Sequence, residues 1–309
     1  MLSKMLPAFF KRAIKTRIRT IAGGGHELYV QSHPGENAYC IKSSNPTARL
    51  PKGGTFPIPP KELWVGYASD AQGYISTGKC HVTEMIRVLE QSGFSIGSAK
   101  RILEFGCAAG RMIRHLPEIV PDAELWGVDP DAERIRWCIE NLTPAIHFAT
   151  TTRVPHLPFE DRYFDLIFCG SVFTHIEDLQ ESWLLELGRV LRPSGKLYVT
   201  IHDEHTVALL DKCRDHLLAK EMQEQPTYYN NKNDFNMIVV GRGALSQVFY
   251  SSHYFQFITP PIFRWISRTT EAYGYQSAVI LEKLGTDCAR ISFSSIECLL
   301  SMLGWFSRQ

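Results

Sequence analysis

The feature that most constrains the fold is an alternation of short apolar runs with helical segments. Five apolar runs are expected to be buried strands, and they lie at residues 101–105, 124–129, 145–149, 164–169 and 196–201. Helical periodicity between them predicts helices near residues 111–120, 131–141 and 178–191. Strands that alternate with crossover helices are typical of a parallel sheet. The sequence therefore predicts a doubly wound α/β fold, with the ligand beyond the carboxyl ends of the strands.

The segment before this core has a different character. Residues 1–25 carry six basic side chains, no acid, and apolar side chains at helical spacing after Pro7. This pattern predicts a basic amphipathic helix that lies either on an anionic membrane surface or against the body of the protein. Gly, Pro, Ser and Asn are frequent in residues 23–60, so we expect an irregular connector there.

A helical leader is expected over residues 61–98, between the extension at 1–60 and the core. Its helical pattern begins at residue 78, and Gly93 stands where a left-handed C-cap belongs. One face of this helix collects the apolar side chains Val82, Met85, Ile86 and Leu89. At the other end of the chain, residues 286–309 form a tail whose apolar run is too short to span a bilayer.

Charge and cysteine content exclude several classes of partner. The 309 residues include 33 Lys and Arg against 32 Asp and Glu, a formal net charge of +1, so nucleic acid is not an expected partner. The eight cysteines contain no C-x-x-C pair, so we expect no metal site and reduced thiols. We predict a cytoplasmic protein, and any peripheral contact with a membrane would be made by residues 1–25.

The stretch "ILEFGCAAG" at residues 102–110 ends a strand and places glycines at 106 and 110. Glycine lacks a Cβ, so the chain can turn sharply there and let a ligand lie against backbone amides. The next strand, "ELWGVD", ends at Asp129, an acid placed to accept hydrogen bonds from both hydroxyls of a ribose. A nucleoside is therefore the expected ligand.

The spacing of the glycines distinguishes between two nucleoside ligands. A dinucleotide fingerprint that starts at Gly106 needs glycines at 108 and 111, where the chain has Ala108 and Arg111. Instead, "ILEFGCAAGRMIRHL" resembles the first motif of class I S-adenosylmethionine-dependent methyltransferases of the bacterial, small-molecule type. The segments "LWGVDPDAERIRWC", "VPHLPFEDRYFDLIFCGSVFTHIED" and "ELGRVLRPSGKLYVTIHDEH" are similar to later motifs of that family, in the right order.

The resemblance covers residues 99–205, and "EAYGYQSAVILEK" is similar to the family's final antiparallel hairpin. It implies a Rossmann-like methyltransferase domain over residues 99–285, with mostly parallel strands, a C-terminal hairpin and an insertion at about 206–245. The upstream "PIPPKELWVGY" and "YISTGKCHVTEMIRVLEQSG" also resemble the leader of such bacterial enzymes.

The resemblance implies S-adenosylmethionine as cofactor and assigns roles to individual residues. The residues expected to wrap the methionine end are Glu104, Gly106, Cys107, Ala108 and Gly110. Asp129 would hold the ribose, Pro130 would pack near the adenine, and Gly170 and Ser171 would line the sheet side. The acid that many members carry before "LPF" is replaced by a run that includes Thr152, so adenine recognition is expected to use hydroxyls or backbone.

Methyl transfer from a sulfonium needs a nucleophile held about 3 Å from the methyl carbon, and a base only if a proton must leave. His175 and His202 are the candidate proton acceptors, although each also suits a structural role. A metal at His202 and His205 is disfavoured because no third ligand has fixed spacing. The insertion is either a lid, with Tyr228, Tyr229 and Phe235 facing the acceptor, or a surface excursion.

The predicted function is transfer of a methyl group from S-adenosylmethionine to oxygen or nitrogen of a small molecule, including a saccharide or lipid-linked acceptor. Two alternatives stay open. The first is a nicotinamide-dependent oxidoreductase on a similar sheet. The second is a nucleoside-binding protein that kept the fold and lost activity.

Overall fold

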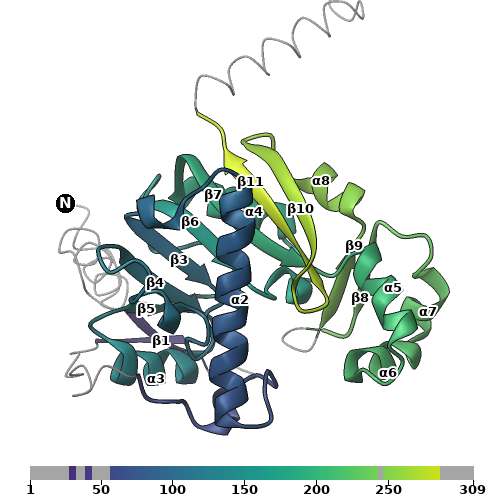
Figure 1. The fold of residues 1–309 in the computed structure, drawn as a ribbon, viewed down its shortest axis with the longest axis horizontal. Helices are drawn as coiled ribbons and strands as arrows, with labels where there is room; N and C mark the ends of the chain where they lie inside the picture. The colour runs from purple at the N-terminus through teal and green to yellow at the C-terminus, as the bar shows by residue number, and fades with distance from the viewer. Residues whose placement is uncertain (1–27, 33–38, 44–55, 243–245, 286–309) are drawn as a thin grey trace, which may run out of the picture.

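The computed structural model describes residues 28–32, 39–43, 56–242 and 246–285 of the chain. Its centre is a seven-stranded sheet with the order β10-β11-β7-β6-β3-β4-β5 (Figure 1). The strands are β3 (Arg101–Phe105), β4 (Glu124–Asp129), β5 (His147–Thr150), β6 (Phe164–Cys169), β7 (Leu191–Ile201), β10 (Phe263–Tyr273) and β11 (Gln276–Lys283). Strands β3 to β7 pair in parallel, whereas β10 and β11 form an antiparallel hairpin on β7. The predicted Rossmann-like sheet with a C-terminal hairpin is confirmed.

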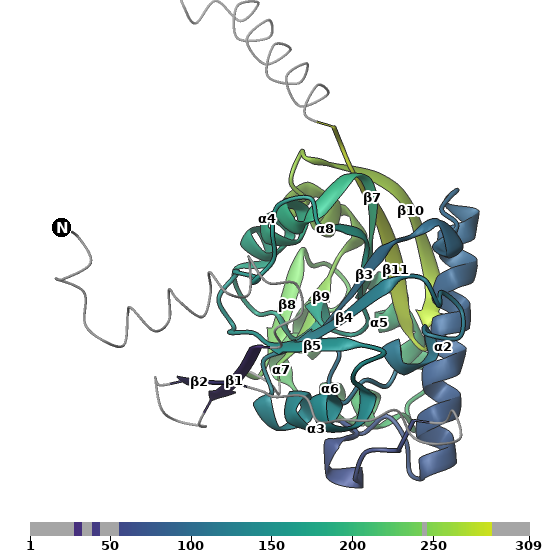
Figure 2. The same ribbon diagram turned by 90° about the vertical axis from the view of Figure 1, so that its left-hand side faces the viewer.

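Helices cover both faces of the sheet (Figure 2). One face packs against α2 (Ala71–Gln91) and α3 (Ala132–Leu142), and the other against α4 (Gln180–Val190) and α8 (Ser252–Ile258). Successive side chains of a strand point to opposite faces. Ile102 therefore joins the core under α2, and its neighbour Leu103 joins the core under α4.

The insertion after β7 folds as a small unit beside the sheet, on the right of Figure 1. It contains α5 (Glu204–Lys212), α6 (Leu217–Gln223), α7 (Pro226–Asn231) and the hairpin of β8 (Met237–Val240) and β9 (Gln247–Tyr250). Tyr228 is buried in the hydrophobic cluster of this unit, so it does not face an acceptor. Tyr229 is exposed, and Phe235 packs against the same cluster.

Two expectations about local structure are wrong. The helix predicted over residues 111–120 is a short 3-10 helix, Ile113–His115, flanked by turns. The Glu104 side chain takes the backbone N–H of Ile113, and Pro117 has no N–H with which to continue a helix. The expected irregular connector contains a hairpin of β1 (Leu28–Ser32) and β2 (Tyr39–Ser43), whose sequences are rich in strand-forming residues.

The leader helix is longer than its apolar pattern indicates, because Asp70 caps it at Gly73, several residues before residue 78. Gly93 has a φ of 81° just after this helix, as predicted for a left-handed cap. The predicted basic helix at 1–25 and the tail at 286–309 lie outside the described residues. Within residues 28–32, 39–43, 56–242 and 246–285, no helix is long and apolar enough to cross a membrane.

Candidate active site

The winding of the sheet reverses between β3 and β6, and the glycine loop follows β3 at this point. Gly106 has a φ of 81°, and a Cβ placed there would lie 2.3 Å from Cγ2 of Val172 in the loop after β6. Only glycine tolerates both the left-handed backbone and this close approach. The two loops therefore meet at the switch point, where ligands bind in doubly wound sheets.

Glu104 lies on β3 at the base of this loop. Its Oε2 accepts the backbone N–H of Ile113 at 3.0 Å, and the residue is buried. Burial raises the pKa of Glu104 to about 8, although nearby Arg111 and the Ile113 N–H act in the opposite direction. The carboxyl group is therefore largely protonated at neutral pH in the free protein and available to respond to a cationic ligand.

Asp129 ends β4 next to the same loop. Its Oδ2 accepts the N–H of Ala108 at 2.8 Å, and its Oδ1 accepts the N–H of Asp131 at 2.9 Å. Burial raises the pKa of Asp129, and these two backbone donors partly offset the effect. Each carboxylate oxygen has a second lone pair, so the side chain can still accept a hydrogen bond from a ligand.

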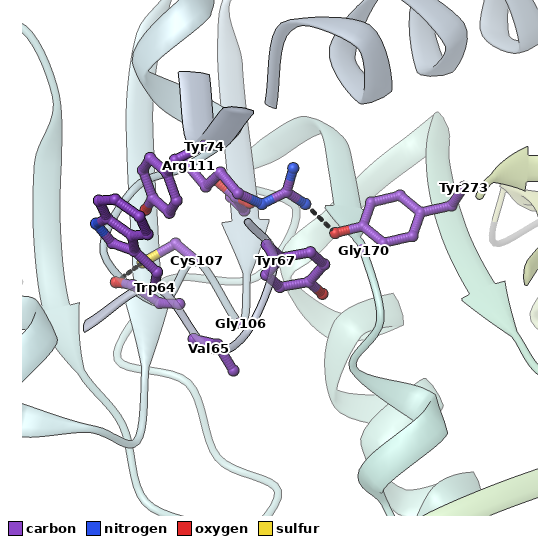
Figure 3. Close-up of a pocket in the computed structure, with 11 residues that line it drawn as sticks. Trp64, Val65, Tyr67, Tyr74, Gly106, Cys107, Arg111, Gly170 and Tyr273 are labelled. Carbon is purple, nitrogen blue, oxygen red and sulfur yellow. Dashed lines mark hydrogen bonds between the residues drawn. The ribbon is translucent and has the colours of Figure 1, made fainter. Parts of the chain in front are cut away.

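A pocket opens above the glycine loop, with about 280 Å³ of space that includes its solvent-open part (Figure 3). The predicted cofactor residues that line it are Glu104, Gly106, Cys107, Ala108 and Gly170. The remaining predicted residues do not line it. Gly110 packs against α3, Asp129 and Ser171 are held by hydrogen bonds beside the loops, and Pro130 and Thr152 are exposed.

Ser171 belongs to a polar network at the carboxyl ends of β6, β7 and the start of β11. Its N–H donates to Oγ1 of Thr200 at 2.7 Å, and its Oγ accepts Nε2 of Gln276 at 2.8 Å. Thr200 Oγ1 donates in turn to Gln276 Oε1 at 2.6 Å. This network fixes the backbone directly after Gly170, which borders the pocket.

Six further residues line the pocket, and the sequence did not assign them to it. Four come from the leader, one follows the glycine loop and one ends β10; they are Trp64, Val65, Tyr67, Tyr74, Arg111 and Tyr273. Trp64 stacks on Tyr74 with ring centroids 5.2 Å apart. The leader is rich in aromatic residues, and this could be read from the sequence. No local pattern, however, shows that these residues lie near β3 or β10.

Comparison with known proteins points to the same part of the chain. Residues 103–199 match the family model described as a methyltransferase domain. The matched range contains the glycine loop, Asp129 and the strands β4 to β6. The chain carries a methyltransferase domain. The predicted class I S-adenosylmethionine-dependent family is thereby confirmed for this domain.

The relatives found by sequence cover only part of the chain. An uncharacterized methyltransferase of Schizosaccharomyces pombe is 27% identical over 136 residues, which cover 40% of this chain and 47% of that protein. A malonyl-[acyl-carrier protein] O-methyltransferase of Hahella chejuensis is 26% identical over 101 residues, covering 33% of this chain and 36% of that protein. The chain thus spans about half the length, or less, of these relatives.

One solved structure supports the fold. The PH0226 protein of Pyrococcus horikoshii superposes with a TM-score of 0.51 at 18% identity, over 72% of this chain and 97% of that one. At this identity the likeness concerns the fold alone. The methyltransferase domain of this chain therefore shares its architecture with that protein.

The two predicted proton acceptors lie outside the pocket lining. His175 Nδ1–H donates to the carbonyl oxygen of Ser246 at 2.6 Å, which leaves Nε2 as the acceptor nitrogen. His202 is 1% exposed between the rings of Phe249 and Tyr275, and neither of its nitrogens has a hydrogen-bond partner. Burial lowers the pKa of both, to about 3 for His202, so both imidazoles are neutral.

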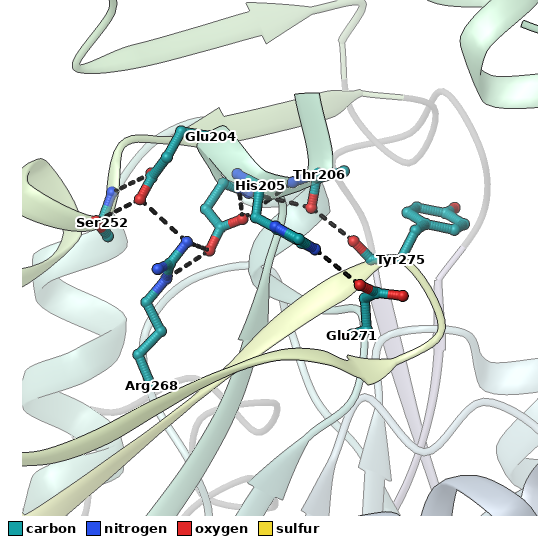
Figure 4. Close-up of polar contacts among 8 residues, drawn as sticks. Glu204, His205, Thr206, Ser252, Arg268, Glu271 and Tyr275 are labelled. Carbon is teal, nitrogen blue, oxygen red and sulfur yellow. Dashed lines mark hydrogen bonds and ion pairs between the residues drawn. The ribbon is translucent and has the colours of Figure 1, made fainter. Parts of the chain in front are cut away.

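The residues after His202 join the insertion to the β10–β11 hairpin (Figure 4). His205 Nε2 lies 2.9 Å from Glu271 Oε1, and Asp203 caps α5 and pairs with Arg268. The His205 side chain thus contacts Glu271 rather than His202. Among the residues that the structure describes, no group of three His, Cys, Asp or Glu side chains could hold a metal ion.

Proposed function

We propose that the protein transfers a methyl group from S-adenosylmethionine to an oxygen or nitrogen atom of a small molecule. The observation that carries this proposal is the contact between Asp129 and the loop at Ala108, beside the pocket above Gly106. A carboxylate, a bare backbone turn and a pocket at the switch point are the elements that an adenosyl ligand needs.

The described residues fit this cofactor. Asp129 would accept hydrogen bonds from the ribose hydroxyls, and the turn at Gly106 would let the sulfonium group lie against the backbone. Thr150 pairs with Asp129 across β4 and β5, and its buried hydroxyl has no hydrogen-bond partner. An unsatisfied buried hydroxyl is costly, so a ligand atom that pairs with Thr150 would gain affinity. When bound, the cofactor would supply an electrophilic methyl group.

The chain's own contribution to the chemistry would be orientation and proton removal. The chain would accelerate the reaction mainly by holding the acceptor atom close to the methyl carbon and in line with the bond that breaks. A hydroxyl acceptor would also have to lose a proton. We propose His175 for this step, because its imidazole is neutral and keeps Nε2 available. His202 is the weaker candidate, because it is buried between Phe249 and Tyr275 and a pKa of about 3 makes it a poor base.

A small-molecule acceptor is favoured by the charge balance of the chain. The net charge of +1 offers no field for nucleic acid. The O-methyltransferase relative from Hahella chejuensis supports an oxygen acceptor as one form of the proposal. Membrane contact through residues 1–25 is also a proposal, and flotation with anionic liposomes, with and without those residues, tests it.

The decisive experiment compares ligands and then products. S-adenosylhomocysteine should raise the melting temperature of the protein, whereas NAD should not. Stabilisation by NAD alone would favour the oxidoreductase alternative. Incubation of the protein and S-adenosylmethionine with metabolite pools should then add about one CH₂ to an acceptor, as read by mass spectrometry. Binding without any such product would favour the nucleoside-binding alternative.

A further inference from the structure

Arg111 is a buried cation beside the pocket, and it forms no ion pair with any described acid. The residue is 4% exposed, lines the pocket and directly follows Gly110 of the glycine loop. A buried charge without a compensating partner is expensive, and it is normally paired in proteins. Glu104 lines the same pocket and interacts electrostatically with Arg111 without forming an ion pair, so the guanidinium can still pair with an anionic group of a ligand.

Tyrosine and histidine side chains contact the Arg111 guanidinium. Its Nη2 donates to the hydroxyl of Tyr273 and lies 3.1 Å from Nδ1 of His81. The guanidinium carbon lies 3.9 Å from the centre of the Tyr67 ring. Figure 3 shows this ring beside the Arg111 side chain. Nη1 is buried and has no hydrogen-bond partner. The leader, α2 and β10 thus hold the side chain in place and leave one donor nitrogen unused.

The backbone of Arg111 is held as firmly as its side chain. A Cβ at Gly78 of α2 would lie 2.3 Å from the carbonyl oxygen of Arg111, so the helix packs directly on this turn. A preorganised donor loses little entropy when it binds its ligand. The position therefore suits a fixed anion site.

We infer that Arg111 binds the carboxylate of the methionyl end of the cofactor, an inference that rests on the proposed function. Planar guanidinium groups suit carboxylates because they offer parallel N–H donors. Glu104 lines the same pocket and would face the ammonium group of that end. The two side chains would then provide one partner for each charge of a zwitterionic amino acid.

The test compares three ligands on the wild-type protein and on Arg111→Gln by titration calorimetry. S-adenosylhomocysteine has both charges, S-adenosyl-3-thiopropylamine lacks the carboxylate, and 5′-methylthioadenosine lacks the whole amino-acid end. Arg111→Gln should weaken S-adenosylhomocysteine roughly 10- to 100-fold and leave the two other ligands within about twofold. Arg111→Lys keeps the positive charge but loses the planar pair of N–H donors, so it should weaken S-adenosylhomocysteine binding less than Arg111→Gln does.

Arg114→Gln is the matched control. Arg114 is 5% exposed and also leaves Nη1 unpaired, but it lies outside the pocket lining and donates to the carbonyls of Phe56 and Pro57. Its loss should lower the melting temperature without changing the ratio of the three affinities. Should Arg111→Gln not fold, the wild-type protein still answers, because it should bind S-adenosyl-3-thiopropylamine roughly 10- to 100-fold more weakly than S-adenosylhomocysteine.

Three outcomes would overturn the inference. Equal losses for all three ligands in Arg111→Gln would make Arg111 a structural residue. Unchanged affinity for S-adenosylhomocysteine with loss of methyl transfer would assign the guanidinium to an anionic acceptor instead. If the wild-type protein binds none of the three ligands, the proposed function fails and this inference fails with it.

Discussion

The carboxylate of Asp129 accepts the backbone N–H of Ala108 at 2.8 Å, so the end of β4 fixes the glycine loop that follows β3. Asp129 therefore has two tasks in this account, since it shapes the loop and would bind the ribose. Ala108 itself has a φ of 46°, a conformation that costs energy without such support.

Asp129→Ala should weaken S-adenosylhomocysteine binding by about 1–3 kcal/mol and also lower stability, because charged hydrogen bonds to ligand and loop are both lost. Calorimetry and thermal unfolding measure the two effects. Asp131→Ala is the control, since Asp131 caps α3 through the N–H groups of Glu133 and Arg134. It should cost about 1 kcal/mol of stability without changing affinity. Unchanged affinity in a folded Asp129→Ala protein would contradict the ribose assignment.

Binding should release a proton from Glu104. Its pKa of about 8 means that the carboxyl group is mostly protonated at pH 7 in the free protein. A nearby ammonium group favours the carboxylate, so affinity for S-adenosylhomocysteine should rise with pH up to about 8. Calorimetry at pH 7 in buffers of different ionisation enthalpy counts the proton. Glu104→Gln should abolish the release, and tight binding by the wild type with no proton exchange would rule out this role.

Gly106→Ala should destabilise the protein through both its backbone and its Cβ. The left-handed φ costs on the order of 1–2 kcal/mol, and the contact with Val172 adds to it. The double variant Gly106→Ala/Val172→Ala should recover the part due to the contact, so the two changes should couple favourably. Denaturant unfolding of the four proteins measures the coupling. Strict additivity would show that the two loops do not meet there.

His202 should make the protein acid-sensitive. Its pKa falls from 6.5 to about 3 on burial, so the unfolded chain takes up a proton more readily than the folded one. Stability contributed by the neutral imidazole is present above pH 6.5 and is lost as the pH falls toward 3. Between pH 7 and pH 5 this loss is about 2 kcal/mol for a single such group. His202→Phe should remove this contribution to the dependence of the unfolding free energy on pH.

The control is His253→Gln, which removes an exposed histidine and leaves the buried imidazole of His202 in place. Burial also lowers the pKa of His81 and His115, and both residues are present in the wild type and in His202→Phe. Only the difference between these two proteins in the dependence of stability on pH is therefore attributed to His202. At pH 7, His202→Phe should be at least as stable as the wild type, since two unpaired buried nitrogens disappear. An unchanged pH slope would mean that His202 is hydrated in solution.

The sequence predicted the parts of the fold that local patterns determine. The runs at 101–105, 124–129 and 164–169 match three strands to the residue, because each is mostly apolar and is followed directly by Gly106, Pro130 or Gly170. The helix predicted at 111–120 was wrong because Glu104, nine residues before Ile113, takes a backbone donor within it and because Pro117 has no N–H with which to continue a helix. Hydrophobic periodicity does not register either effect.

The same limit applies to the site. The glycine loop has a recognisable sequence motif, and five of the residues predicted to bind the cofactor line the pocket. The hydrogen bond between Arg111 and Tyr273 joins residues 162 positions apart, and the leader reaches the pocket only through the packing of α2. Arg111 stood out in the sequence merely as a missing fingerprint glycine, and its environment became visible only in three dimensions.

A crystal structure of the protein with S-adenosylhomocysteine would show directly where the ligand binds. We expect the ribose hydroxyls on the carboxylate of Asp129, the thioether over Gly106 and the amino-acid end between Glu104 and Arg111. Electron density for the ligand at any other place, or its absence at a saturating concentration, would rule out this binding site.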